Sequence, residues 1–227
     1  MKLKLPLAFK NIVLLASISL ALIACGPEGS TGLEPDSIVA DKPHVKISTA
    51  YVPDEHAPVM ISGDNRLHVH ASEEDAFRVF PRPKGAFDFF EEPPIEGDNY
   101  IAKGWQSNIE AFGILLIRNK LVLALHTLDN ADQETLTDKL KVYEEAFDPI
   151  KADVVPGDSA QYWFWESGQV RLMICMSRDA NSRSQLVTAL GDNEVMNALR
   201  MSRTAASQDL TEARVKLRDR LSNVKDK

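Results

Sequence analysis

Two histidines of the sequence have a spacing that could hold a metal ion. His68 and His70 lie two residues apart in the alternating stretch RLHVHA, and alternate side chains of a strand project to the same face. Imidazole nitrogens bind Zn²⁺ or Cu²⁺, so a third ligand such as His126, His56 or Asp64 would complete a site. The sequence gives no indication that any of these residues lies near the pair. Hydrogen-bonded or solvated surface histidines are the simpler interpretation. We therefore predict no metal site.

Four consecutive aromatic residues could form a binding surface. In a strand, Trp163 and Trp165 would project to one face, and Tyr162 and Phe164 to the other. Exposed tryptophans are frequent hot spots of protein interfaces, whereas buried aromatic rings fill cores. Trp163 and Trp165 are the candidate partner surface, and core packing is the alternative.

Motifs of nucleophilic catalysis are absent from the sequence. It has no Gly-x-Ser-x-Gly elbow, and Ser62 and Ser167, which precede glycines, fall in expected turns without a partnered histidine. Neighbouring carboxylates such as those of Glu144 and Glu145 point in different directions on a helix. A glycine-rich phosphate loop is also missing. The sequence thus predicts no catalytic residue and no cofactor.

The amino terminus carries the signals of export. Residues 1–24 contain three lysines and then the uncharged apolar run 12–24, which has the length of the apolar region of a signal peptide. This run is too short to span a bilayer, which needs about 20 residues. The tetrapeptide Leu22-Ile23-Ala24-Cys25 resembles the lipobox of bacterial lipoproteins, which implies cleavage before Cys25 and a diacylglyceryl group on its sulfur. An ordinary secreted protein is the alternative.

The expected lipidation of Cys25 predicts where the protein is located. One acyl chain binds a membrane only marginally, whereas the diacylglycerol and palmitate chains of a lipoprotein anchor it firmly. The protein would then be held at a cell membrane, facing the periplasm or the exterior. Gly26 stands where, by the lipoprotein resemblance, an aspartate retains proteins in the inner membrane, so the outer membrane is favoured in a cell that has one.

Composition limits the classes of partner. The chain has 26 basic and 33 acidic residues, and removal of residues 1–24 takes away three lysines, so the mature charge is 23 − 33 = −10. This charge disfavours nucleic acid as a partner and makes the lipid, not a basic patch, the anchor. Besides Cys25 only Cys175 is present, which excludes an intramolecular disulfide in the mature chain. We expect Cys175 to be an inert buried thiol.

The pattern of the sequence divides the chain into four parts. After the signal peptide, residues 25–43 are rich in glycine, proline and acids, which is typical of a flexible tether. A domain follows over residues 44–202, and a charged helix over residues 203–227. The clearest signal in the domain is a hairpin over residues 109–128, where two apolar runs flank a polar turn.

The remaining elements of the domain are expected from periodicity and caps. We expect strands over 44–52 and 66–71, a helix over 72–80 capped by Ser72, an irregular loop over 84–104, a helix over 132–147, a hairpin over 161–176 turning at Ser167-Gly168, and a short helix from Asp192. The fold class that follows is α+β, an antiparallel sheet of β-hairpins with helices on one face. A helix followed by a hairpin occurs twice, so residues 66–128 and 132–202 are candidate duplicated units.

This order of motifs resembles that of the BamE/OmlA-like (SmpA) small lipoproteins, and its tandem form is similar to the β-lactamase inhibitor protein. The resemblance implies helix-plus-sheet units and a role in outer-membrane assembly or maintenance, and it transfers no site residue. The residues that carry it are Ser72-Glu73-Glu74 at a helix start, Trp105 before a hairpin, and then helix 134–147, Pro149, Tyr162-Trp163-Phe164 and Gly168-Gln169-Val170.

The function that these observations favour is a membrane-anchored envelope lipoprotein that acts as a non-catalytic protein-binding or accessory module. Its partner would be another envelope protein, whose identity the sequence does not reveal. Two alternatives remain open: a periplasmic small-ligand or inhibitor-type binding module, and a metal-dependent hydrolase. The first would need an apolar concavity or exposed aromatic patch, and the second a cluster of histidines and carboxylates.

Overall fold

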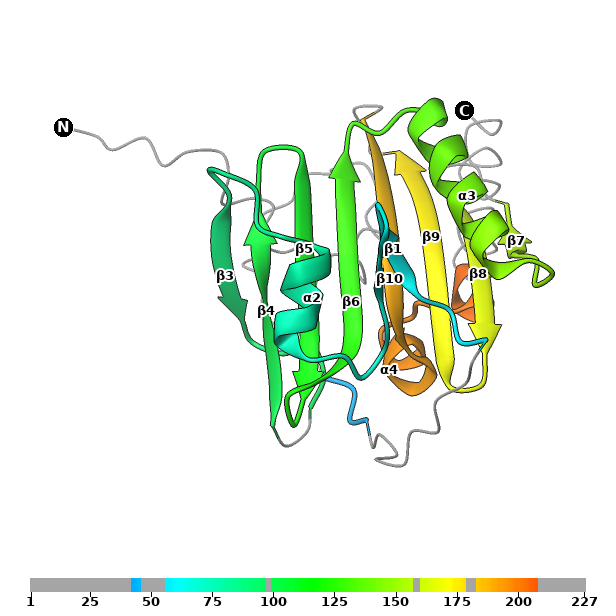
Figure 1. Ribbon diagram of the computed structural model, residues 1–227. Helices are drawn as coiled ribbons and strands as arrows, with labels where there is room; N and C mark the ends of the chain where they lie inside the picture. Colours follow the sequence, from blue (N-terminus) through cyan, green and yellow to red (C-terminus); the bar gives the residue numbers. More distant parts are fainter. Residues whose placement is uncertain (1–41, 46–55, 97–98, 157–159, 179–182, 208–227) are drawn as a thin grey trace, which may run out of the picture.

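The computed structural model describes residues 42–45, 56–96, 99–156, 160–178 and 183–207. An eight-stranded antiparallel sheet runs through the centre, with the strand order β3-β4-β5-β6-β10-β9-β8-β7 (Figure 1). A separate two-stranded hairpin, β1 and β2, crosses in front of it. The predicted α+β class with an antiparallel sheet is therefore confirmed.

Helices and strands follow one another in two similar runs. The first run is α2, β3, β4, β5 and β6, the second is α3, β7, β8, β9 and β10, and β6 pairs with β10 at the centre of the sheet. The bounds are β1 Met60–Ser62, β2 Asn65–Leu67, α2 Glu73–Val79, β3 Phe87–Glu91, β4 Tyr100–Gln106, β5 Glu110–Ile117, β6 Lys120–Asp129, α3 Gln133–Phe147, β7 Asp153–Val155, β8 Ala160–Ser167, β9 Val170–Arg178, β10 Ser184–Asp192 and α4 Asn193–Ala198.

The predicted hairpin over residues 109–128 is confirmed as β5 and β6. Its turn places Arg118 at φ 48° and Asn119 at φ 60°, and two positive φ angles are what a tight turn between twisted strands requires. The hairpin over 161–176 is likewise confirmed as β8 and β9, with Gly168 at φ 57° in its turn.

The predicted helices begin where the sequence placed their starts, and Ser72 is the cap that was expected. Ser72 and Asp75 form a capping box at the start of α2, in which the Ser72 hydroxyl accepts from the Asp75 N–H at 3.1 Å. Asp132 accepts from the Thr135 N–H at 2.8 Å at the start of α3, and Asp192 caps α4. These side chains satisfy backbone N–H groups that have no partner within the helix.

The loop predicted over residues 84–104 is wrong, because the segment contains β3 and most of β4. Its prolines, Pro93 and Pro94, fall between the two strands and do not interrupt either of them. Gly104 is the residue of β4 that fits only as glycine, since a Cβ there would lie 2.1 Å from the Phe112 carbonyl oxygen and 2.6 Å from the Phe89 ring. The glycine thus marks a close approach of strands and not a loop.

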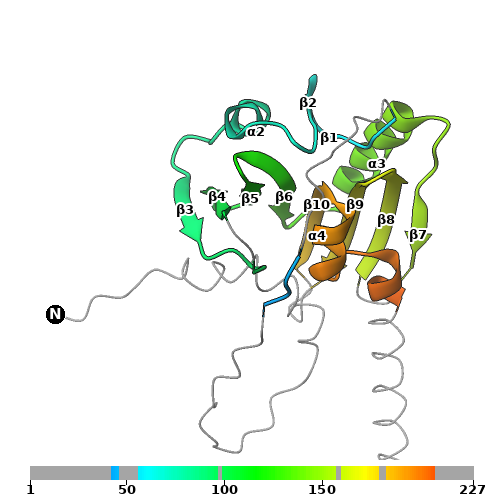
Figure 2. The same ribbon diagram turned by 90° about the horizontal axis from the view of Figure 1, so that it is seen from below.

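Helices cover both faces of the sheet, so the prediction that they lie on one face is wrong. The first face, as we call it, is covered by α2, α3 and the β1–β2 hairpin, and the second face by α4 and the residues after it (Figure 2). The cause is in the strands: all seven residues from Leu121 to Thr127 are buried, and a strand that is apolar on both sides must be covered on both sides.

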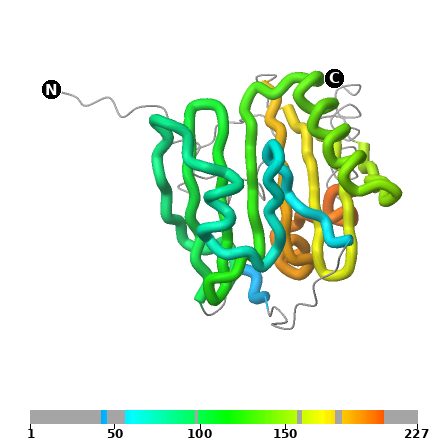
Figure 3. Tube along the Cα trace, viewed as in Figure 1, coloured from blue at the N-terminus to red at the C-terminus, as the bar shows by residue number. Residues whose placement is uncertain are grey.

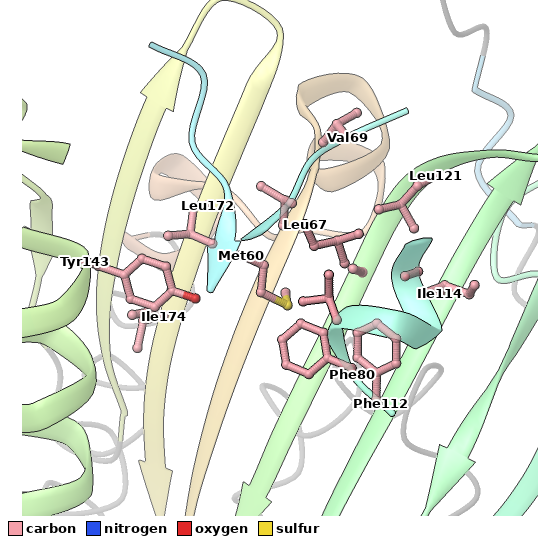
Figure 4. Packing of buried hydrophobic residues seen from close by; sticks show 14 of the residues in the cluster. Met60, Leu67, Val69, Phe80, Phe112, Ile114, Leu121, Tyr143, Leu172 and Ile174 are labelled. Atoms are coloured by element: carbon pink, nitrogen blue, oxygen red, sulfur yellow. The ribbon is translucent and has the colours of Figure 1, made fainter. Parts of the chain in front are cut away.

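The β1–β2 hairpin closes the first face between the two helices. Met60 and Leu67 point down onto the central strands, near Phe80 and Leu172 (Figure 4). The Ile61 N–H donates to the Tyr143 hydroxyl of α3 at 2.9 Å, so a hydrogen bond also joins the hairpin to α3.

A buried arginine fastens the end of α4 to the second face. Arg171 of β9 donates to the Asn197 side-chain oxygen at 2.8 Å and to the Met201 carbonyl at 3.0 Å, and it forms an ion pair with Glu166. A buried cation needs such partners to offset its lost hydration, so we assign Arg171 a structural role.

Several predicted segments lie outside the described residues. They are the signal peptide 1–24, Cys25, the tether up to residue 41, residues 46–52 of the first expected strand, and residues 208–227 of the charged helix. Residues 42–45 are described and lie at the lower end of the sheet, shown in blue (Figure 3). Within the described part of the chain, no helix is long and apolar enough to cross a membrane.

Candidate functional site

The structure places the candidate partner surface of Trp163 and Trp165 in the core. Trp163 is 7% exposed and Trp165 is 1% exposed. The Trp165 ring lies 5.9 Å from the rings of both Tyr143 and Phe147, so α3 covers it. Tyr162 and Phe164 on the second face are buried too. Core packing, the alternative interpretation, describes these residues, and they offer no surface to a partner in the folded chain.

The histidines of the sequence do not come together as metal ligands. Strand β2 ends at Leu67, and His68 beyond it is exposed. His70 has φ 67°, and its backbone N–H donates to the Leu121 carbonyl at 2.7 Å, so the strand alternation expected over His68 and His70 is not formed. In the described ranges, no three histidine, cysteine, aspartate or glutamate residues are placed to hold a metal ion.

Cys175 lies in the second face, as expected for an inert thiol. Burial raises the pKa of its thiol to about 12, so the reactive thiolate is not populated near neutral pH.

A polar cluster that the sequence did not predict lies in the first face, and we call it the Glu110–His126–Lys139 cluster. His126 of β6 is 8% exposed, and its Nε2 lies 3.3 Å from a carboxylate oxygen of Glu110 in β5. The Phe80 ring packs 5.0 Å from the imidazole. Burial, with a smaller contribution from the charge of Lys139, lowers the pKa of His126 to about 3. The imidazole is therefore neutral and donates from Nε2 to the carboxylate.

Lys139 of α3 is the third member of the cluster, and it acts on the other two residues through its charge. Burial lowers the pKa of its amine to about 8, and the nearby Glu110 carboxylate opposes this shift. The Nδ1 atom of His126 is buried and has no hydrogen-bond partner among the described residues. A carboxylate and a neutral imidazole can exchange a proton, but here both groups serve a buried contact between strands and α3. The geometry fits a structural polar network better than an open catalytic site.

Strand β3 carries the two most exposed large apolar side chains among the described residues. It is the last strand of the sheet, and no described strand pairs with its outer side (Figure 1). Phe87 is 72% exposed and Phe90 is 75% exposed. Edge strands of natural proteins are normally shielded by charge, bulges or a covering element, so a five-residue edge with two exposed aromatic rings is suited to contact. We call the outer side of Phe87–Glu91 the β3 edge.

Acidic residues surround the β3 edge, and two of them already have partners. Asp88 pairs with Arg82 at 2.8 Å, and Glu92 pairs with Lys42 at 2.6 Å. Glu91 differs from them, because its half-buried carboxylate forms no hydrogen bond or ion pair with any described residue. Burial raises the pKa of Glu91, as expected for a carboxylate that has lost water without gaining a cation.

The start of the described chain is held beside this edge. In addition to the Lys42–Glu92 pair, the Glu96 N–H donates to the Pro43 carbonyl at 2.9 Å, and His44 forms a parallel bridge with Glu96. The segment that would follow the tether therefore begins next to the end of β3.

No protein-family model matches the sequence, and no curated protein matches it. Among solved structures, the chain is similar to a cysteine-rich secretory protein from Staphylococcus aureus, with 14% identity and a TM-score of 0.28. The alignment covers 56% of this chain and 46% of that protein. A likeness at this level supports no conclusion about fold or function.

Proposed function

We propose that the chain is a lipid-anchored envelope protein whose domain binds an extended segment of another envelope protein at the β3 edge, as a non-catalytic accessory module. The observation that carries the proposal is the exposure of Phe87 and Phe90 on a strand whose outer side is unpaired. An extended segment added to such an edge gains main-chain hydrogen bonds, and alternate side chains supply specificity.

The opposite edge of the sheet is less suited to this role. Strand β7 has three residues, and its one exposed large apolar side chain is Val154, at 49%. Strand β3 has five residues and presents two aromatic rings, which bury far more area on binding than a valine does. The comparison favours β3 and provides a control position in Val154.

The expected lipid on Cys25 would keep the β3 edge near a membrane. The predicted tether, residues 25–43, would separate the lipid from the domain, and a flexible chain of that length spans about 25 Å. Near the end of this tether, Lys42 pairs with Glu92 just after β3. The edge would therefore meet partners that are themselves in or close to the membrane, which is the outer one if Gly26 acts as the lipoprotein resemblance implies.

We also propose that the domain is a duplication of one unit, a helix followed by four strands. Both halves have a helix followed by four strands. Trp105, Phe112 and His126 face one another across β4, β5 and β6, while Trp163, Ile174 and Thr188 do so across β8, β9 and β10, and His126 pairs with Thr188 at the centre. In a duplicated pair β3 would correspond to β7, and the aromatic surface would have developed on β3 alone.

A cross-linking experiment tests the proposal in the membrane. A photoreactive phenylalanine analogue replaces Phe90 in the full lipidated chain, and the same analogue replaces Val154 in a control. We expect the probe at position 90 to cross-link to one contiguous segment of one envelope protein, and the probe at position 154 to give no such product. Equal products at both positions, or none at position 90, would overturn the proposal.

The two other functional classes have less support. A small-ligand module built on Trp163 and Trp165 would need these rings to line an open surface, and both are buried, Trp165 against Phe147 of α3. A metal-dependent hydrolase would need His126 to meet further ligands, whereas its described contacts are Glu110 and Phe80.

A further inference from the structure

We infer that the segment bound at the β3 edge is basic, and that Glu91 selects it by pairing with a lysine or arginine. This inference rests on the proposed function of the β3 edge and names the chemistry of its partner. It makes Glu91 a specificity-determining residue of the surface.

The first argument is the state of the Glu91 carboxylate. It is half-buried at the end of β3 and lacks an ion pair or hydrogen bond within the described residues. A carboxylate that loses hydration without gaining a partner costs free energy. A cation that arrives with the bound segment would remove that cost, and charge-assisted hydrogen bonds are the stronger ones.

The second argument is that three described cations around the β3 edge already have acidic partners. Arg82 pairs with Asp88, Lys42 pairs with Glu92, and Lys103 pairs with Glu73 of α2. The unpaired Glu91 and the exposed Glu96 therefore leave a net negative charge at this end of the sheet. A positively charged segment complements that charge and is attracted to it during association.

The exposed rings of the edge suit the same kind of segment. The Lys103 amine already lies 5.4 Å from the centroid of the Phe90 ring, a distance at which a cation is attracted to the ring face. Phe87, Phe89 and Glu91 project to one face of β3 and Phe90 to the other, because alternate residues of a strand share a face. A segment in which apolar and basic residues alternate would complement the row of Phe87, Phe89 and Glu91.

A second copy of the chain is a poor occupant by the same reasoning. In an antiparallel pairing of two β3 edges in register, Glu91 of one copy would lie opposite Phe87 of the other, so its carboxylate would gain no cation from the strand it pairs with. A parallel pairing in register would set Glu91 against Glu91, and like charges directly opposite one another are destabilising. The charge of the edge therefore favours a different, basic segment.

Synthetic peptides test the inference on the full lipidated chain in detergent. Fluorescein-labelled ten-residue peptides alternate valine and threonine and carry lysine, arginine, glutamine or glutamate at one central position. Fluorescence anisotropy measures their binding to the unaltered chain, to Glu91→Gln, to the Phe87→Ser/Phe90→Ser variant and to a matched control, Glu144→Gln. The control removes the same charge from an exposed position on α3.

The expected result is binding of the lysine and arginine peptides about tenfold tighter than the glutamate peptide, which is the effect of roughly one charge-assisted pair. Glu91→Gln should abolish this preference and retain binding, while Glu144→Gln should change neither. Equal affinity for all four peptides, lost in the double serine variant, would overturn the inference and leave the proposed function intact. Failure of every peptide to bind, or binding unaffected by the serine variant, would overturn both.

Discussion

His126 Nε2 lies 3.3 Å from Glu110 Oε2, beside the hydrophobic core cluster of the first face. The contact joins β5 to β6 beneath Phe80 and is influenced by the charge of Lys139 on α3. Because the imidazole is buried and neutral, this contact makes the stability of the domain depend on pH.

The first prediction concerns acid. The pKa of His126 is about 3 in the folded chain, against 6.5 for an unperturbed histidine, so between these values the unfolded state binds one more proton. The free energy of unfolding should therefore fall as the pH is lowered from about 6.5 toward 3, by up to about 1.4 kcal/mol per pH unit from this residue. Urea unfolding followed by tryptophan fluorescence at pH 7, 6 and 5 measures the slope.

The controls for this prediction are two histidine variants. His126→Asn should reduce the slope between pH 7 and 5, and the variant of an exposed residue, His68→Asn, should leave it unchanged. An equal slope in the original chain and in His126→Asn would mean that His126 is protonated in the folded state.

The second prediction concerns Lys139. Its amine has a pKa of about 8 in the folded chain, against 10.5 for an unperturbed lysine, so the charged form is disfavoured by folding at neutral pH. Lys139→Met should raise the urea midpoint at pH 7, and this gain should shrink as the pH rises from 8 to 10.5. Lys141→Met, at an exposed position on the same helix, should have little effect. If the gain in stability did not change with pH, it would be due to packing alone and not to the lost charge of Lys139.

The third prediction separates core from surface aromatics. Trp165 is 1% exposed and Phe90 is 75% exposed. Trp165→Ala should lower the free energy of unfolding by about 3 to 5 kcal/mol, whereas Phe90→Ala should change it by no more than about 0.5 kcal/mol. Thermal and urea denaturation measure both variants. A stable Trp165→Ala protein would return that residue to the list of surface candidates.

The fourth prediction concerns the close approach at Gly104. A Cβ at this position would lie 2.1 Å from the backbone carbonyl oxygen of Phe112, and a strand carbonyl cannot move away as a flexible side chain can. Gly104→Ala should therefore destabilise the domain by at least about 1 to 3 kcal/mol, the usual cost of overpacking. Equilibrium unfolding is again the measurement, with Ala102→Gly as the opposite change in the same strand. Unchanged stability in Gly104→Ala would contradict the register of β4 and β5.

The elements that sequence reasoning found are those with strong local signals. Asp132 predicted the start of α3, and the polar turn at Asn119 predicted the hairpin of β5 and β6, because caps and turns depend on neighbouring residues. Strand β10 was missed although it lies at the centre of the sheet. Its residues Ser184–Asp192 include Ala189 and Gly191, which have low β-propensity, and its pairing with β6 and β9 is decided by distant segments.

The candidate sites show the same division. Glu110 and His126 lie on the two strands of the predicted hairpin, but Lys139 lies on α3, and the packing of α3 on the sheet depends on residues distant in the sequence. The β3 edge did leave a signal, since Phe87 and Phe89 alternate with Asp88, which is a strand pattern. The nearby prolines led to the prediction of a loop. The exposure of Phe90 depends on β3 being the last strand, which only the assembled sheet shows.

The most direct test of the central claim is hydrogen exchange of the β3 backbone amides, with and without the partner segment captured by the cross-link at position 90. The account predicts that amides within Phe87–Glu91 exchange more slowly when the segment is bound, while those of Asp153–Val155 in β7 do not change. Protection at β7 instead, or binding of the segment with no protection in β3, would contradict strand addition at the β3 edge.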